Sequence, residues 1–193
     1  MKKHKKENVI QIGEELFKTQ GYHNTGTEDI LKKSDYPRSS FYYNFKSKEG
    51  FAIEVLEHYG TNASKFYQSI LNDKKRGSPL TRLEKFANIM KDTASNKNFK
   101  SECLVQKFAV ECAAINDDLR IATEIQLNKI LSVIESCIKE GQENQEIRTD
   151  ISASKLSELF HSQIYGGFIL SRLKNKGDVM GSNMNMILSY LKR

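Results

Sequence analysis

The segment PRSSFYYNF, residues 37–45, carries more hydrogen-bonding side chains than a solvated helix face needs. A proline followed by a run without glycine predicts a helix start, because proline presets the angle φ and its missing N–H has no helical partner there. In such a helix, Phe41 and Phe45 lie on one face. Polar groups on the other faces can then hydrogen-bond to base edges or phosphates. These side chains are Arg38, Ser39, Ser40, Tyr42 and Tyr43.

The residues before this segment predict two more helices. Apolar positions from Val9 to Phe17 recur at helical spacing until QGYHNTG interrupts the pattern. Thr25 and Glu28 match a capping box, in which each side chain satisfies an unpaired N–H at a helix start. Asp35 then stands in a tight turn, where aspartate tolerates the left-handed conformation better than most residues.

The remainder of the chain also has a helical pattern. Ser47 can cap a fourth helix, which is long enough to link two lobes. Amphipathic or largely apolar segments follow, separated by polar or glycine-containing breaks, and none shows the period-2 pattern of a strand. We therefore expect an all-α protein of about nine helices.

Composition places few limits on the partner. The chain has 193 residues and a formal net charge of +6, and eight of its lysines lie at the N-terminus or around residues 37–45. Such runs suit an acidic partner or a plain solvated surface. No run approaches about eighteen apolar residues, so we expect a cytoplasmic protein without a membrane span. The lysines are Lys2, Lys3, Lys5, Lys6, Lys32, Lys33, Lys46 and Lys48.

The cysteines and histidines do not predict a metal site. Cys103, Cys112 and Cys137 are odd in number and lie within helical patterns, which favours reduced thiols over disulfides or a metal cluster. The four histidines lack the spacing of metal ligands. We expect neither a metal nor a cofactor.

Two short helices joined by a tight turn, the second with a polar face, predict a helix-turn-helix that binds double-stranded DNA. The second helix would enter the major groove, where base edges differ in their donors and acceptors. We expect Arg38, Ser39, Ser40 and Tyr43 to face bases. The backbone would be held by Thr27, Tyr42 and Lys48.

The stretch LFKTQGYHNTGTEDILKKSDYPRSSFYYNFKSKEGF resembles the TetR family of one-component transcriptional regulators. The resemblance implies a homodimer, by default a repressor and not an enzyme, that binds a palindromic operator and releases it when a small-molecule inducer binds. The family resemblance also implies a DNA-binding domain over residues 1–50 and a ligand-binding and dimerisation domain over residues 51–193. The residues in the family's order and spacing are Leu16, Phe17, Gly21, Tyr22, Thr25, Asp29, Ile30, Phe41, Tyr42, Phe45, Lys48 and Glu49.

Some residues depart from the family pattern. Gly13 stands where alanine is usual, at a cost of up to ~1 kcal/mol in helix propensity. Asp35 and Tyr36 replace a Gly-Val pair. The operator sequence cannot be inferred from the family, because Ser39, Ser40 and Asn44 replace the common Gly, Thr and His.

The resemblance implies that the last two helices form the dimer interface. A stripe at helical spacing in the penultimate helix is the expected contact, with Gly166 and Gly167 permitting close approach of two backbones. Alternatively, the stripe packs inside one subunit. The predicted interface residues are Leu156, Phe160, Gln163, Ile164, Gly167 and Phe168.

Cys103 is a possible trigger for release of DNA. If Ser101 caps a helix, Cys103 lies in its first turn, where free N–H groups favour a thiolate, with Lys100 and Lys107 nearby. The Cys-Leu pair also resembles a TetR subgroup in which some members sense electrophiles or oxidants. Alternatively, Cys103 is a small buried hydrophobic residue.

We expect a ligand pocket among the later helices. Aromatic and sulfur-containing residues at helical spacing suggest its lining, although the same residues also suit an ordinary core. The predicted ligand-binding residues are Phe86, Met90, Cys103, Phe108, Cys112 and Tyr165.

Two other classes of function remain open at this point. A Cys-dependent hydrolase would need a base near Cys103, and His161 is the histidine we consider for it. A helical adaptor without DNA binding would account for the amphipathic helices. It would not account for the polar face of residues 37–45.

Overall fold

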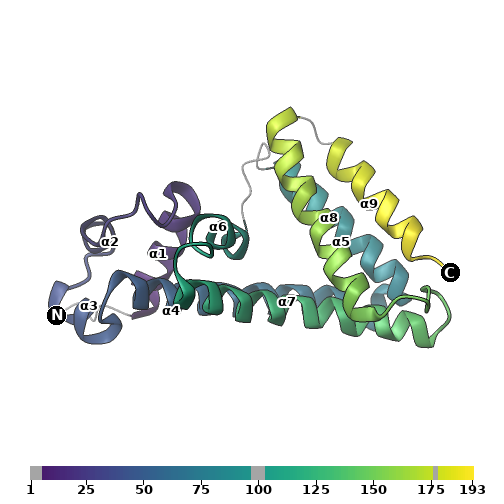
Figure 1. Ribbon diagram of the computed structural model, residues 1–193, viewed down its shortest axis with the longest axis horizontal. Coiled ribbons are helices and arrows are strands. Elements are labelled where there is room, and N and C mark those ends of the chain that lie inside the picture. The colour runs from purple at the N-terminus through teal and green to yellow at the C-terminus, as the bar shows by residue number, and fades with distance from the viewer. Residues whose placement is uncertain (1–5, 97–102, 176–177) are drawn as a thin grey trace. The chain divides into compact units, whose positions relative to one another are not determined.

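The structure is a computed structural model that describes residues 6–96, 103–175 and 178–193 (Figure 1). Nine α-helices and one 3-10 helix form these described parts, which confirms the predicted all-α fold. The elements are α1 (Lys6–Gln20), α2 (Thr27–Ser34), α3 (Arg38–Phe45), α4 (Lys48–Leu71), η1 (Lys74–Arg76), α5 (Pro79–Asn96), α6 (Leu104–Glu111), α7 (Asp117–Glu143), α8 (Ala153–Lys174) and α9 (Asp178–Leu191).

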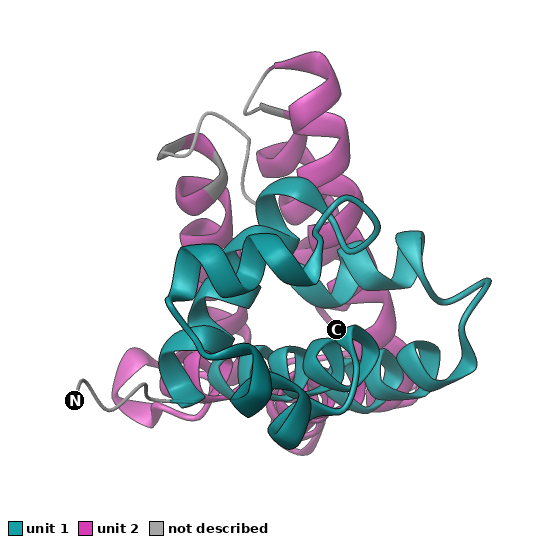
Figure 2. Cartoon of the chain, turned by 90° about the vertical axis from the view of Figure 1, so that its left-hand side faces the viewer, with its two compact units in different colours: residues 1–62, 102–127 teal, residues 63–101, 128–193 magenta. Residues whose placement is uncertain are grey.

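The chain divides into two compact units that do not follow chain order. Figure 2 shows unit 1, residues 1–62 and 102–127, in teal, and unit 2, residues 63–101 and 128–193, in magenta. Helices α4 and α7 each contribute to both units, and α6 belongs to unit 1. The boundary predicted at residue 50 separates two functional domains, which these compact units do not test, and it stays a prediction.

Unit 1 is built around a cluster of phenylalanine rings. The rings of Phe41, Phe45 and Phe51 all contact one another, with centroid separations of 4.8 to 5.0 Å. Phe17 contacts Phe51 and, edge-on, Phe108 of α6. All five side chains are buried, and Phe41 and Phe45 lie on one face of α3, as predicted. Each buried ring contributes about 1.5–3 kcal/mol to stability, so α3 rests on a firm apolar support.

The start of α2 differs by one residue from the prediction. The N-cap is Gly26, whose N–H donates to the carboxylate of Asp29 at 3.0 Å. Thr25 precedes the N-cap position, and its buried hydroxyl donates to the Gly21 carbonyl at 2.6 Å. The predicted capping box of Thr25 and Glu28 is therefore wrong, and the Glu28 carboxylate is not used for capping.

The turns around α3 follow the sequence closely. Asp35 ends α2 in the left-handed region with φ of 51°, as predicted. Pro37 is the N-cap of α3 rather than its first helical residue. The Ser47 hydroxyl accepts the Gly50 N–H at 3.0 Å, which confirms the predicted cap of α4.

In unit 2, helix α8 packs against α9, and α5 packs against both. Phe86 of α5 lies in the core of unit 2. The centroid of its ring is 4.4 Å from that of the Tyr67 ring. Arg82 is buried, donates to the Leu71 carbonyl at 2.6 Å and pairs with Glu140 at 2.7 Å. These partners keep its charge compensated inside the unit.

No helix in the described ranges combines the length and the apolar character needed to cross a membrane.

Candidate nucleic-acid interface

Helix α3 presents a polar face opposite its buried phenylalanines. Tyr43 is the most exposed of its aromatic residues, with 78% of its surface accessible, and Tyr42 is also exposed. Ser39 lies one turn before Tyr43 and is exposed, whereas Ser40 is half-buried. The face therefore offers hydroxyl groups on a helix that is short enough to lie across a groove.

Arg38 begins α3 and forms an ion pair with Glu28 of α2. The two helices are thus joined by side chains as well as by their turn. The sequence did not reveal this pair, because Glu28 was assigned to a cap. Glu28 and Arg38 are ten residues apart on two different helices, so their spacing does not predict a contact as a three- or four-residue spacing within one helix does.

Thr27 and Lys48, the predicted backbone contacts, lie at the starts of α2 and α4 and are both half-buried. The Lys48 ammonium lies 4.3 Å from the centroid of the Tyr22 ring, a cation–π contact. Partial burial lowers the pKa of Lys48. The sequence did not reveal this contact between Tyr22 and Lys48.

Two more polar residues lie beside this face, and neither was among the predicted DNA contacts. Lys46 ends α3 with φ of 65°, and its ammonium donates to the Tyr43 carbonyl at 2.8 Å. Asn44 donates to the hydroxyl of buried Tyr36 at 3.0 Å. A lysine directly after a short helix was the available signal for Lys46, since helix C-termini attract cations.

The predicted ligand residues are divided between the two units. Phe108 and Cys112 are buried in the core of unit 1, where Phe108 contacts Tyr22 with ring centroids 5.6 Å apart. Phe86 and Met90 are buried on α5 in unit 2, and Tyr165 is half-buried on α8. Packing alone accounts for Phe108 and Cys112, as in the alternative interpretation.

Cys103 does not lie in the first turn of α6. It is the N-cap, and α6 begins at Leu104. The Lys107 ammonium donates to the Lys18 carbonyl at 2.9 Å and lies 3.9 Å from the Glu111 carboxylate. The predicted thiolate position is therefore wrong, since α6 begins two residues later than a cap at Ser101 implies. Ser101 and Lys100, invoked with it, fall outside the described residues.

All three cysteines are free thiols, and Cys103 is the half-buried one. Burial raises the pKa of Cys112 and that of Cys137 to about 11. Within the described ranges, no cluster of three or more His, Cys, Asp or Glu side chains could hold a metal ion.

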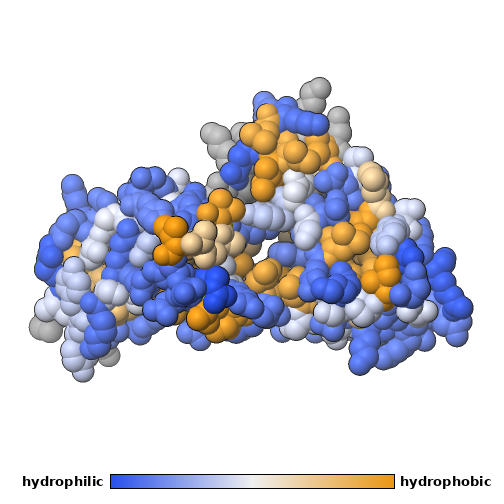
Figure 3. All heavy atoms as spheres, in the orientation of Figure 1, coloured by the Kyte–Doolittle hydropathy of each residue, from blue (hydrophilic) through white to orange (hydrophobic). Residues whose placement is uncertain are grey.

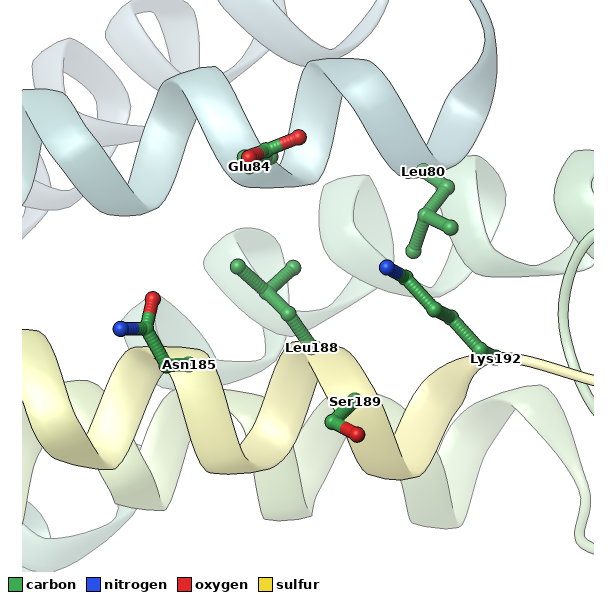
Figure 4. Close-up of a pocket in the computed structure, with 6 residues that line it drawn as sticks. All are labelled: Leu80, Glu84, Asn185, Leu188, Ser189 and Lys192. Atoms are coloured by element: carbon green, nitrogen blue, oxygen red, sulfur yellow. The ribbon is translucent and has the colours of Figure 1, made fainter.

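A hollow of about 230 Å³ lies between α5 and α9 in unit 2. Figure 4 shows Leu188 and the Lys192 ammonium pointing from the α9 side toward α5. Its lining shares no residue with the predicted ligand set. The lining residues are Leu80, Glu84, Asn185, Leu188, Ser189 and Lys192.

The stripe predicted as a dimer contact points into the subunit. Leu156, Phe160 and Ile164 are buried, and a Cβ on Gly167 would meet the Met180 sulfur of α9. These four residues fill the core of unit 2 and are not available at a surface, so this part of the prediction is wrong. The other two, Gln163 and Phe168, are half-buried.

Comparison with known proteins shows which family has this architecture. Residues 9–55 match the family model described as bacterial regulatory proteins, tetR family, and residues 79–187 match the tetracyclin repressor-like C-terminal domain. The second match alone covers more than half of the chain.

Relatives and solved structures agree with the family models. The repressor DhaR of Mycobacterium sp. (strain GP1) is 23% identical over 96% of this chain and 91% of its own length. The repressor NemR of Escherichia coli (strain K12) is 25% identical over 72% and 69%, respectively.

A regulatory protein TetR from Rhodobacter sphaeroides has a crystal structure with a TM-score of 0.84 and 25% identity, covering 96% of this chain and 97% of that one. Reduced E. coli NemR shares the fold with a TM-score of 0.85 at 18% identity, covering 96% of both chains. On the strength of both matched family models and of the helix-turn-helix in unit 1, this chain belongs to the TetR family of transcriptional regulators.

Proposed function

We propose that the protein is a transcriptional repressor that binds a palindromic operator as a homodimer and releases it when a small molecule binds. Residues 1–50 would bind DNA, and residues 51–193 would bind the ligand and the second subunit. The observation that carries the proposal is the exposed polar face of α3, held on buried Phe41 and Phe45. The relatives DhaR and NemR are both named repressors.

The face of α3 suggests a division of roles. Ser39 and Tyr43 lie at its centre and suit base edges, and Arg38 can donate two hydrogen bonds to a guanine. Ser40 lies at its border. The backbone contacts are assigned to Thr27, Tyr42 and Lys48, whose hydroxyl and ammonium groups suit phosphate oxygens.

A second copy of the chain would cover the exposed apolar residues of α8 and α9. Figure 3 shows hydrophobic residues gathered along α8. A Cβ on Gly166 would meet no atom within 4 Å, which leaves room for a partner's backbone. A two-fold operator also requires a two-fold dimer. The residues assigned to this interface are Leu159, Gly166, Leu170, Leu173, Met186 and Tyr190.

Two observations support a ligand acting on the C-terminal part. Among the described residues of α8, His161 Nδ1 and Ser171 Oγ are buried atoms without a hydrogen-bond partner. Buried polar atoms are normally paired, so a ligand with polar groups would find partners here. His161 lies one turn before Tyr165, and Ser171 lies six residues after it. A covalent alternative is modification of Cys103, the accessible thiol.

The test begins with selection of genomic fragments by the purified full-length protein, followed by fluorescence anisotropy on the recovered operator. Tyr42→Phe and Lys48→Ala should weaken binding to every duplex, and Lys48→Ala should reduce the salt slope by about 0.9 per subunit. Arg38→Ala should relax base preference. Lys155→Ala, at an exposed lysine of α8, is the control.

Unchanged affinity of all three variants for every duplex would contradict the assigned reading face. Absence of any selected fragment would contradict operator binding itself. Repression is tested separately, with a reporter gene under the recovered operator.

A further inference from the structure

The ion pair between Glu28 and Arg38 is the feature of the DNA-binding unit that these roles do not explain. Both side chains are more than half exposed, at 69% and 59%. Glu28 is the second residue of α2, and Arg38 is the first residue of α3. The Glu28 carboxylate is thus paired with the Arg38 guanidinium, the group assigned to contact a base.

Helix dipoles explain why these two residues pair. The N-terminus of a helix carries a partial positive charge, which favours Glu28 in the first turn of α2. The same effect disfavours Arg38 at the start of α3. The Arg38 guanidinium therefore gains by turning from its own helix end to the Glu28 carboxylate.

Among the described contacts, Glu28 makes no other side-chain hydrogen bond or ion pair. The cap of α2 is made by Asp29, whose carboxylate accepts the Gly26 N–H. An exposed ion pair adds little to the stability of a fold. The main effect of the pair is therefore to fix the position of the Arg38 guanidinium.

The chemistry of the guanidinium shows what this position permits. Arginine has five N–H donors in a rigid fork, and the contact with Glu28 is made by Nη2. The remaining donors can still approach the O6 and N7 acceptors of a guanine. A phosphate, in contrast, would be repelled by the carboxylate beside the same guanidinium.

We infer that Glu28 is a specificity-determining residue, which positions Arg38 to read a guanine and prevents it from serving as a general phosphate contact. This inference rests on the proposed operator binding. Glu28 acts through Arg38, so it is a positioning residue rather than a direct reader.

The experiment compares Glu28→Gln with Glu15→Gln in the full-length protein. Glu15 is the matched control, because it forms a comparable ion pair in the same unit. Its carboxylate lies 2.9 Å from the Lys33 ammonium and links α1 to α2. Both variants remove one negative charge. Selection from randomised half-sites, with anisotropy at several salt concentrations, measures base preference and salt slope. Circular dichroism checks folding, and Glu28→Ala serves as a second variant.

We expect Glu28→Gln to lower the preference for guanine at the Arg38-dependent position about two- to fivefold, the range that exposed ion pairs support. The salt slope should steepen by up to about 0.9 per subunit, because the freed guanidinium can neutralise a phosphate. Glu15→Gln should leave base preference unchanged. In an Arg38→Ala background, Glu28→Gln should have no further effect on base preference.

Three results would overturn the inference. Glu28→Gln could keep the parent's guanine preference, it could change that preference equally without Arg38, or Arg38→Ala could leave the preference intact. In all three cases operator binding by the parent stands. Failure of the proposed function is a different outcome, in which the parent binds no duplex selectively.

Discussion

The backbone N–H of Tyr22 donates a 2.8 Å hydrogen bond to the carboxylate of Glu111, a residue 89 positions further along the chain. Lys107, one turn earlier on α6, donates to the carbonyl of Lys18 near the end of α1. The rings of Tyr22 and Phe108 also lie in contact. Helix α6 is thereby fastened to the segment that leads into the helix-turn-helix.

Removal of the Glu111 carboxylate should loosen this attachment. Glu111→Ala leaves the Tyr22 N–H without its charged acceptor, and we expect a loss of about 1–2 kcal/mol in the free energy of unfolding. Urea unfolding measures it, with Glu57→Ala, at an exposed glutamate of the same unit, as control. Equal stability of the two variants would show that the contact adds nothing.

Gly13 on α1 should resist replacement by alanine, the residue usual in the family. A Cβ there would collide with the Phe51 ring and lie 3.1 Å from Val55 Cγ2. Alanine gains up to ~1 kcal/mol in helix propensity, but overpacking costs about 1–3 kcal/mol, so the net effect should be a loss of stability. Thermal unfolding of Gly13→Ala, alone and with Phe51→Leu, tests this. The smaller side chain should recover part of the loss.

A charge in the exposed apolar surface of α8 should separate the proposed dimer. Leu173 is 77% exposed, and Leu173→Glu or Leu170→Glu would place an unpaired carboxylate in the interface. Sedimentation equilibrium should show a monomer for each variant. Val110→Glu, at an exposed residue of unit 1, should stay dimeric. A dimer that persists in both α8 variants would place the interface elsewhere.

His161 should make the protein sensitive to mild acid. Burial lowers its pKa from 6.5 to about 4, so between these values the unfolded chain binds a proton that the folded chain does not. Stability should therefore fall as the pH decreases from 6.5 to 4, by about 3 kcal/mol in total. Urea unfolding at several pH values should show a flatter profile for His161→Asn. The control is His23→Asn, at an exposed histidine.

N-ethylmaleimide should react with Cys103 before the other cysteines. The raised pKa of Cys112 and that of Cys137 keep those buried thiols protonated, whereas Cys103 is partly accessible. Peptide mass spectrometry over time gives the order of labelling. If modification is the trigger, operator release should follow Cys103 labelling and be lost in Cys103→Ser. Release from Cys103→Ser at the parent's rate would rule out the covalent trigger.

Local features near α3 could be predicted because neighbouring residues determine them. The buried face of Phe41 and Phe45 follows from helical spacing, and the Ser47 cap and the left-handed Asp35 follow from local backbone chemistry. The capping box failed by one residue, since Thr25 and Gly26 both suit an N-cap. Burial of Thr25, a tertiary effect, decided between them.

Residue types and their spacing were enough to predict the helices, the helix-turn-helix and the polar face of α3. Three further features depend on the folded chain: Leu156 and Phe160 turn inward, Phe108 joins the core of unit 1, and Glu28 holds Arg38. They could not be predicted because helical periodicity identifies an apolar face without identifying what covers it. Contacts between residues distant in sequence depend on how the whole chain packs.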